Sequence, residues 1–295
     1  MVAPSVAILA RRDDVAAVAL ATLLRRRRRC RVAIAYDQDL AFARFAHRPS
    51  SGLVVGSANT SIVSLADDVV RLPDGTSIDA TTDVVVCRIT TLAPARQSNP
   101  ERQAYAEAET FAMALSWLAG LGVAVLNRPS PTGLAGAEVD LLRLHRLADG
   151  VGLAVPHLRL YANAARRPMQ ADRQRMEWTG PWLPRSFATA DPGVVGPPLP
   201  CPEAWSEPVR PTGAALVLGA SVHGAPHALH SRLAALAAAA GLAVCEIGLG
   251  RTTSHAEPVV TGISAVPWLA EPGRLALLAD YLTERGRRHH QERAA

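Results

Sequence analysis

The residues best suited to binding a metal ion are three histidines in one short segment. His223, His227 and His230 lie close together in the chain, and imidazole nitrogens are common zinc ligands. Pro226 interrupts a regular helical spacing between the first two, and the four cysteines lie far away in sequence. Helix-cap and surface roles are therefore the favoured interpretation, and the sequence predicts no metal ion.

Arginine is the second chemical feature of the chain. All 31 basic residues are arginine, and lysine is absent from the sequence. Schiff-base chemistry, lysine general bases and lysines that hold ATP phosphates are thereby excluded. The run Arg25–Arg29 suits the C-terminal end of a helix or an acidic partner. A formal net charge of only +5, with few aromatic residues near the run, disfavours nucleic acid as a partner.

Sequence motifs of nucleophilic catalysis are absent. The segment Gly219-Ala220-Ser221 does not match G-x-S-x-G, and no H-E-x-x-H or glycine-rich phosphate loop of the Walker or Rossmann kind occurs. Glu107 and Glu109 are two residues apart on a predicted helix, so they face different directions and do not form a carboxylate pair. The motifs therefore predict no catalytic residue.

Length and composition indicate a globular chain. With 295 residues, 49% of them hydrophobic and 19% charged, the chain can bury a core in one large domain or two small ones. The cysteines form no C-x-x-C pair, which favours a reducing cytoplasm. The longest uncharged stretch, 110–127, contains Gly120 and Gly122, so it predicts a buried helix followed by a strand and not a membrane span.

The first ninety residues alternate between strand and helix patterns. A continuous apolar run such as 84–88 is typical of a strand that is buried on both faces, and Asp74-Gly75 predicts a tight turn. This alternation indicates an α/β sheet. Strands are predicted at 6–9, 31–36, 53–55, 62–65, 69–72, 77–78 and 84–88, with helical segments at 14–24 and 40–45.

The remainder of the chain divides around a proline-rich tract. Residues 166–211 hold ten of the 22 prolines together with Trp178, Trp182 and Trp205, which predicts irregular structure with some packed side chains. An exposed tail is predicted over 287–295. Helices are predicted at 101–119, 137–149, 227–240 and 274–285, and strands at 123–126, 158–161, 214–218, 243–249 and 257–263.

Six segments occur in an order that is typical of one enzyme family. They are Val84-Val85-Val86-Cys87-Arg88, the helix 101–109, Val125-Leu126-Asn127-Arg128-Pro129, Gly152-Leu153-Ala154-Val155-Pro156, 215–222 and 233–247. In this order the sequence resembles the RimK-like ATP-grasp ligases, including those that modify ribosomally made peptides. The resemblance extends over most of the chain.

The resemblance implies an α/β fold: a pre-ATP-grasp-like N-terminal sheet with flanking helices, and a truncated C-terminal ATP-grasp-like domain. The implied division is a pre-ATP-grasp-like domain at 1–130, a helix–strand connection at 131–165, a proline-rich linker at 166–211, the truncated domain at 212–288 and a tail at 289–295.

The departures from the family pattern concern the nucleotide site. The central ATP-binding subdomain of the family would fall where this chain has its proline-rich tract, and the phosphate lysines have no counterpart. Gly248 stands where a magnesium aspartate is expected, and Gly262 and Ser264 stand where the glutamate and asparagine are expected. Glycine offers magnesium no side-chain oxygen. The sequence thus resembles a degenerate ATP-grasp protein, with no cofactor, no metal and no catalytic residue.

The function that follows from this resemblance is peptide binding. We expect a partner protein in the biosynthesis of a ribosomally synthesised, post-translationally modified peptide natural product. The lost nucleotide residues favour a non-catalytic protein over an enzyme. It would present the precursor peptide to a modifying enzyme, with the peptide added as a strand to a sheet edge and acidic peptide residues paired with arginine. The candidate peptide-binding residues are Arg88, Arg102, Asn127, Arg128 and Trp268.

Two other functions stay open. One is an ATP-dependent carboxylate–amine ligase whose arginines hold the phosphates, since arginine binds phosphate bidentately. The other is a nucleotide-independent peptide hydrolase or isomerase that uses His223 or Glu246. In each case we expect a cytoplasmic homodimer, or a heterodimer with a paralogue, without membrane or nucleic-acid partners.

Overall fold

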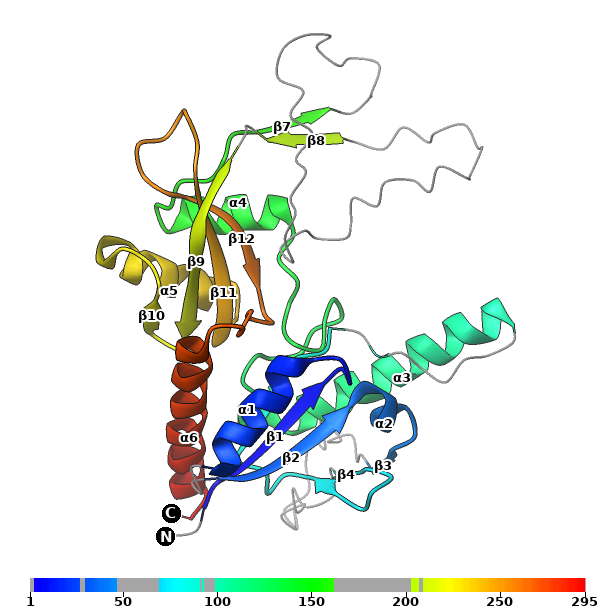
Figure 1. Ribbon diagram of the computed structural model, residues 1–295. Helices are drawn as coiled ribbons and strands as arrows, with labels where there is room; N and C mark the ends of the chain where they lie inside the picture. Colours follow the sequence, from blue (N-terminus) through cyan, green and yellow to red (C-terminus); the bar gives the residue numbers. More distant parts are fainter. Residues whose placement is uncertain are drawn as a thin grey trace, which may run out of the picture. The chain divides into compact units, whose positions relative to one another are not determined.

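The computed structural model describes residues 3–26, 30–46, 69–90, 92, 99–161, 203–206 and 209–294. The chain divides into two compact units (Figure 1). Unit 1 comprises Met1–Glu138, Gly241–Cys245 and Ala265–Ala295, and unit 2 comprises Val139–Ala240 and Glu246–Ser264.

Unit 1 is built on a parallel sheet. Strands β1 (Ser5–Ala10), β2 (Arg31–Tyr36) and β6 (Val84–Cys87) lie in the order β2-β1-β6, and all pairs are parallel. A single parallel bridge between Val85 and Val125 continues the sheet beyond β6. Every residue of β6 is buried, as its continuous apolar run predicts for a strand covered on both faces.

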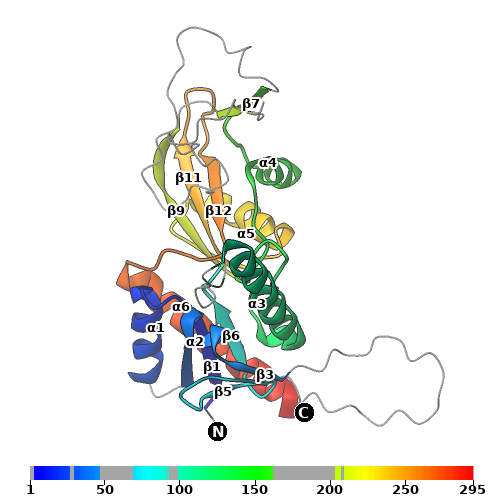
Figure 2. The same ribbon diagram turned by 90° about the vertical axis from the view of Figure 1, so that its right-hand side faces the viewer.

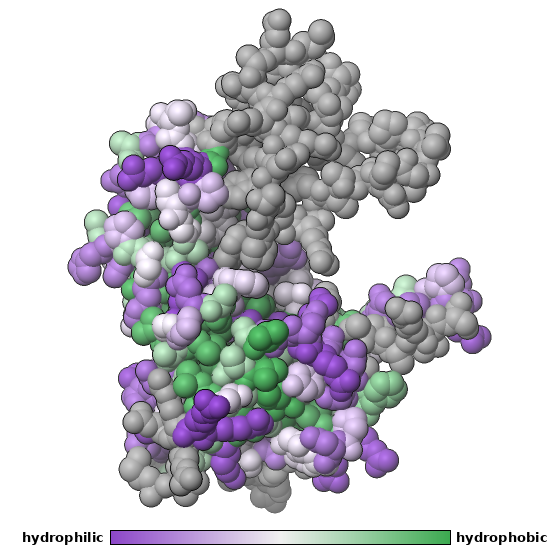
Figure 3. Space-filling view, viewed as in Figure 1, coloured by the Kyte–Doolittle hydropathy of each residue, from purple (hydrophilic) through white to green (hydrophobic). Residues whose placement is uncertain are grey.

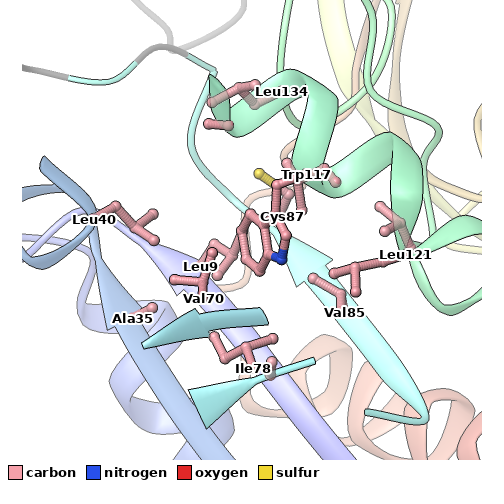
Figure 4. Close-up of a cluster of buried hydrophobic side chains, with 14 of the residues drawn as sticks. Leu9, Ala35, Leu40, Val70, Ile78, Val85, Cys87, Trp117, Leu121 and Leu134 are labelled. Atoms are coloured by element: carbon pink, nitrogen blue, oxygen red, sulfur yellow. The ribbon is translucent and has the colours of Figure 1, made fainter. Parts of the chain in front are cut away.

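Helices cover the two faces of this sheet. Helix α3 (Pro100–Gly120) packs on one face, where Trp117 lies among Leu9, Val85 and Cys87 (Figure 4). Helices α1 (Val15–Arg26) and α6 (Pro272–Ala294) pack against each other and against β1 on the other face. Alternate residues of β1 point to opposite faces, which is why this strand contributes to both layers of the core.

A small antiparallel sheet completes unit 1. After the short helix α2 (Asp37–Ala41), strands β3 (Arg44–Ala46), β4 (Val69–Arg71) and β5 (Ser77–Ile78) lie in the order β3-β4-β5. The Asp74 carboxylate accepts hydrogen bonds from the backbone N–H and hydroxyl of Thr76 at 2.8 and 3.0 Å, which confirms the predicted turn. The predicted strands at 53–55 and 62–65 lie outside the described residues.

Unit 2 contains a second, mainly antiparallel arrangement of strands. Its sheet has the order β10-β9-β11-β12; Figure 1 labels β10, and Figure 2 shows β9, β11 and β12 side by side. Helix α4 begins after Asp140, whose side chain accepts from the backbone N–H of Arg143. The elements are α4 (Leu141–Gly150), β7 (Leu158–Tyr161), β8 (Glu203–Ser206), β9 (Arg210–Leu218), β10 (Ser221–His223), the 3-10 turn η4 (His227–Leu229), α5 (His230–Ala239), β11 (Val244–Arg251) and β12 (Val259–Ser264).

Four local predictions need correction. Residues 123–126 are not a strand: the 3-10 turn η2 (Gly122–Ala124) follows α3, because Gly122 adopts a positive φ of 59°, and only Val125 joins the sheet. The patch 40–45 ends a helix and begins β3. Residues 203–206, predicted to be irregular, pair with β7. The predicted tail at 287–294 is helical, because α6 continues along the sheet.

The end of α6 is held by a buried carboxylate. His289 Nδ1 lies 2.9 Å from the backbone oxygen of Asp83, and His290 Nδ1 lies 3.4 Å from its Oδ1. These two histidines belong to the tail that the sequence predicts to be exposed, and they are half-buried. Among the helices that the structure describes, none combines the length and apolar character needed to cross a bilayer.

Candidate functional site

The carboxyl ends of the parallel strands of unit 1 form one edge of the sheet, which we call the carboxyl edge. Residues 11–14 follow β1, Tyr36 ends β2 and Arg88 follows β6. Ligands of open parallel sheets bind at this edge. Residues that contact a ligand of unit 1 are therefore expected to gather at the carboxyl edge.

Arg88 is bound within the protein. Its Nε donates to Asp14 Oδ2 at 2.7 Å, one terminal nitrogen donates to Asp14 Oδ1 at 3.3 Å, and the other donates to the Pro267 carbonyl at 3.2 Å. The Arg88 side chain is only 6% exposed. Asp14 Oδ1 also accepts from the backbone N–H of Ala17 and so caps α1. Arg88 thus joins β6, the start of α1 and the segment before α6.

Asn127 also uses its whole side chain for internal hydrogen bonds. Its amide nitrogen donates to the carbonyls of Val244 and Ala265 at 2.8 and 3.3 Å. Its amide oxygen accepts from the backbone N–H groups of Ala243 and Val244, both at 2.9 Å. These bonds satisfy both donors and both lone pairs of the amide. Asn127 therefore anchors two segments that return to unit 1 from the second half of the chain.

A small cavity lies between Arg88 and Asn127, with Cys87, Leu126 and Leu278 among its lining residues. Its space is on the order of one water molecule, far below the few hundred Å³ of a cofactor site. Burial raises the pKa of the Cys87 thiol to about 12. The thiol is therefore protonated near neutral pH and is not a nucleophile.

Two of the other predicted residues are exposed close to this pair. Arg128 directly follows Asn127 and is exposed. Trp268 directly follows Pro267, whose carbonyl Arg88 holds, and is 58% exposed. The structure thus gathers Arg88, Asn127, Arg128 and Trp268, with the first two buried and the last two open to solvent.

Arg102 lies elsewhere in unit 1. It occupies the first turn of α3, where the Asn99 side chain accepts from its backbone N–H. Trp117, which anchors α3 to the core, is fifteen residues further along, or about 22 Å at 1.5 Å per residue. Arg102 is therefore exposed at the far end of the helix and does not belong to the carboxyl edge.

The carboxyl edge contains residues that motif reasoning missed. The Arg12 guanidinium carbon lies 5.8 Å from the centre of the Tyr36 ring, and Arg11 pairs with Asp13 at 3.0 Å. Asp14 is predicted only as the first residue of the helical segment 14–24, yet it is the ion-pair partner of Arg88. The usable signal is the topology, since residues that directly follow parallel strands meet at one edge.

The sequence matches no protein-family model and no curated protein. Solved structures match along nearly the whole chain. The macrocyclase MdnB from Microcystis aeruginosa MRC shares 16% identity over 95% of this chain and 99% of its own, with a TM-score of 0.65. The ATP-grasp ligase PsnB complexed with a minimal precursor, Mg and ADP shares 17% identity over 96% and 98%, with a TM-score of 0.62.

A third structure is the RiPP-associated ATP-grasp ligase of Chryseobacterium gregarium in complex with ADP and a leader and core peptide. It shares 12% identity over 95% of this chain and 96% of its own, with a TM-score of 0.62. The chain has an ATP-grasp-like fold. The predicted α/β class and the resemblance are confirmed at the level of the fold.

The ATP-grasp-like fold allows the expected magnesium positions to be located in unit 2. Gly248 of β11 lies directly opposite Gly262 of β12, so two of the three expected ligand positions are neighbours, as a shared ion would require. A Cβ added to Gly248 would lie 2.5 Å from the Thr261 hydroxyl oxygen. Neither glycine offers a carboxylate, and a side chain at Gly248 would meet Thr261, so these two positions do not fit a bound magnesium ion.

Glu246 is the remaining acid on β11 near these positions. It lies opposite Ser264 and is 1% exposed. The three candidate histidines are also in unit 2, where the His227 and His230 rings are 5.0 Å apart and His230 Nε2 lies 3.0 Å from the Ala225 carbonyl. Within the described part of the chain, no three His, Cys, Asp or Glu side chains are placed to hold a metal ion.

Proposed function

We propose that this protein binds the precursor peptide of a ribosomally synthesised, post-translationally modified peptide and presents it to a separate modifying enzyme. In this proposal it is a non-catalytic relative of the ATP-grasp ligases. The observation that carries the proposal is the Gly248–Gly262 pair in β11 and β12.

The glycine pair argues against nucleotide-dependent ligation for a physical reason. Magnesium binds carboxylate and carbonyl oxygens that bridge it to phosphates, and this pair has no side-chain oxygen at either position. Thr261 already occupies the space next to Gly248, so a single Gly248→Asp substitution would not create a ligand without moving Thr261. The absence of lysine from the chain removes the usual phosphate contacts as well.

Peptide binding is supported by what the matching structures contain. One PsnB structure is complexed with the precursor peptide PsnA2, and the macrocyclase MdnC is bound with the precursor peptide MdnA. We propose that this chain also binds a precursor peptide but does not catalyse ligation. Of the five candidate residues, Arg128, Trp268 and Arg102 are exposed and available for contact, while Arg88 and Asn127 position the surface around them.

Calorimetric titration tests the proposal. The purified protein is titrated with the precursor peptide encoded beside its gene, and separately with magnesium-ATP. We expect binding heat for the peptide and none for the nucleotide. Nucleotide binding accompanied by ADP release on mixing with the peptide would instead establish a ligase with an arginine-based phosphate site.

A second candidate function rests on Glu246, the buried acid that β11 retains. If the protein were a hydrolase or isomerase of the peptide, Glu246→Gln and His223→Ala would change the product of the pathway. In our proposal both variants leave the product unchanged, provided that peptide affinity is retained. Mass spectrometry of the modified peptide distinguishes the two functions.

We also propose that the protein acts as a homodimer or as a heterodimer with a paralogue. Light scattering on the purified chain, alone and mixed with the paralogue, would report a mass of twice the 31.2 kDa monomer or the sum of the two chains. A monomeric mass in both samples would refute this part of the proposal.

A further inference from the structure

We infer that the precursor peptide docks on the carboxyl edge of unit 1, and that this edge selects a segment with an acidic side chain beside an apolar one. The inference rests on the proposed peptide-binding function and names the surface and the chemistry that it recognises. Nothing in unit 2 is needed for it.

The apolar part of the surface is made by α1 and the segment before α6. Val15 is 79% exposed and Val18 is 43% exposed, and their i, i+3 spacing puts them on one side of α1. Trp268 is 58% exposed. In Figure 3 the hydrophobic colour gathers where α1 faces the viewer, with hydrophilic side chains on either side.

Arg88 brings the two elements together. Asp14, which directly precedes Val15, and Pro267, which directly precedes Trp268, both accept hydrogen bonds from the same guanidinium. The exposed valine and the exposed tryptophan therefore lie on either side of one buried ion pair. A side chain that packs between them would be desolvated next to arginine, which is the setting of an interface anchor.

The charges at this edge are unevenly matched. Asp13, Asp14 and Glu271 are held by Arg11, Arg88 and Arg274 at 3.0, 2.7 and 3.6 Å. The exposed guanidiniums of Arg12 and Arg128 contact no carboxylate among the residues that the structure describes.

Two further acids, Asp37 and Asp39, lie in the short helix α2 that follows β2. Asp37 follows β2, and its Oδ1 is buried without a hydrogen-bond partner within the described structure. Because β2 lies at one end of the order β2-β1-β6, and Arg128 follows the Val125 bridge beyond β6, these acids and Arg128 lie at opposite ends of the edge. The end that holds Arg128 is therefore positive. A peptide carboxylate next to an apolar side chain complements this charge and the apolar part of the surface.

A peptide fits this surface better than a nucleic acid does. Stable binding to a nucleic-acid backbone neutralises roughly six to ten phosphates in well-studied proteins, and this edge has two unmatched arginines. A free anion would gain nothing from Val15 or Trp268. Only a ligand with both a carboxylate and an apolar side chain uses the whole surface.

Fluorescence anisotropy with the labelled precursor peptide tests the inference. The variants are R12E/R128E and W268A, and the matched control is R31E, because Arg31 is an exposed arginine at the start of β2, on the opposite edge of the same sheet. We expect Kd to rise at least about tenfold for R12E/R128E, about fivefold for W268A and less than about twofold for R31E. Equal thermal unfolding of all variants shows that they are folded.

A charge exchange makes the test specific. A precursor peptide whose acidic residues are replaced by lysine should bind R12E/R128E more tightly than it binds the wild type. Unchanged Kd for R12E/R128E and W268A with the natural peptide would overturn the inference while leaving peptide binding intact. Failure of the wild type to bind the peptide would instead overturn the proposed function. Stronger binding of a labelled oligonucleotide than of the peptide would refute the peptide as occupant.

Discussion

The carboxyl edge of the unit 1 sheet and the opposite edge, which we call the amino edge, contain similar charged residues in different surroundings. At the amino edge Asp83 is 1% exposed; its Oδ2 accepts from the backbone N–H and hydroxyl of Ser5 at 2.8 and 3.0 Å. His290 and Arg293 of α6 point at its Oδ1 from 3.4 and 3.6 Å. At the carboxyl edge Arg88 and Asp14 make a comparable buried pair, but Arg12 and Arg128 remain exposed around it.

The difference indicates which edge is structural and which is available for binding. A buried carboxylate is costly unless donors and cations surround it. At the amino edge Ser5 supplies the donors to Asp83 Oδ2, and Arg293 of α6 lies 3.6 Å from Oδ1. At the carboxyl edge the buried pair is satisfied by one arginine, so the neighbouring arginines are not required for stability. Cations that the fold does not need are available to a ligand.

The largest expected effect comes from breaking the buried pair at the carboxyl edge. Arg88→Ala leaves the Asp14 carboxylate and the Pro267 carbonyl without their donor, and we expect a loss of about 3–5 kcal/mol in the free energy of unfolding. Urea denaturation measures it. The double variant D14N/R88M removes the unpaired charge, keeps a side-chain oxygen that can cap α1, and should recover a large part of that loss; no recovery would mean that Arg88 acts through packing.

A substitution at the amino edge should lower stability without changing the affinity for the peptide. Asp83→Ala leaves the Ser5 donors unsatisfied and should lower the free energy of unfolding by about 2 kcal/mol, with faster hydrogen exchange in the last turns of α6. The Kd for the precursor peptide should stay within about twofold of the wild type once the protein is folded. Weakened binding comparable with that of R12E/R128E would show that the two edges are not distinct.

Cys87, at the end of β6, makes the free energy of unfolding depend on pH in the alkaline range. Burial holds the pKa of its thiol at about 12 against an ordinary value of 9.0, so above pH 9 the unfolded chain releases the proton and the folded chain keeps it. The stabilisation is thus complete below pH 9 and is lost progressively up to about pH 12, with a loss of about 1.4 kcal/mol by pH 10. Cys87→Ala should remove this part of the alkaline loss, which urea titrations at pH 8 and pH 10 would measure.

The smallest effect is expected at the rim of the amino edge. The Arg293 side chain is half-exposed and lies 3.6 Å from Asp83 Oδ1, so Arg293→Ala should lower the free energy of unfolding by no more than about 0.5–1 kcal/mol. The difference should shrink in high salt, because exposed ion pairs are screened. A loss as large as that of Asp83→Ala would mean that Arg293 alone compensates the buried carboxylate.

Short-range pattern is enough to predict the elements of the sheet. The apolar run at 84–88 predicts a strand buried on both faces, and β6 is such a strand. Helical periodicity predicts α1, α3 and α5. The order of motifs predicts the ATP-grasp-like fold and locates Gly248 and Gly262. The predicted domain boundaries stay a prediction, as does the choice of peptide-contacting residues.

The contacts that define the candidate site join residues far apart in the chain. Arg88 and Asp14 are 74 residues apart, Asn127 and Val244 are 117 apart, and Asp83 and His289 are 206 apart. A local pattern indicates that a side chain is charged and which face of a helix or strand it occupies. It does not say which partner the folded chain will bring to it.

For this reason the sequence by itself assigns Arg88 and Arg128 the same role, while the tertiary structure separates them. The backbone periods of helices and strands are properties of neighbouring residues and can be read along the chain. Burial and charge compensation depend on the packing of distant segments. That packing buries Arg88 against Asp14 and Pro267 and leaves Arg128 and Trp268 exposed.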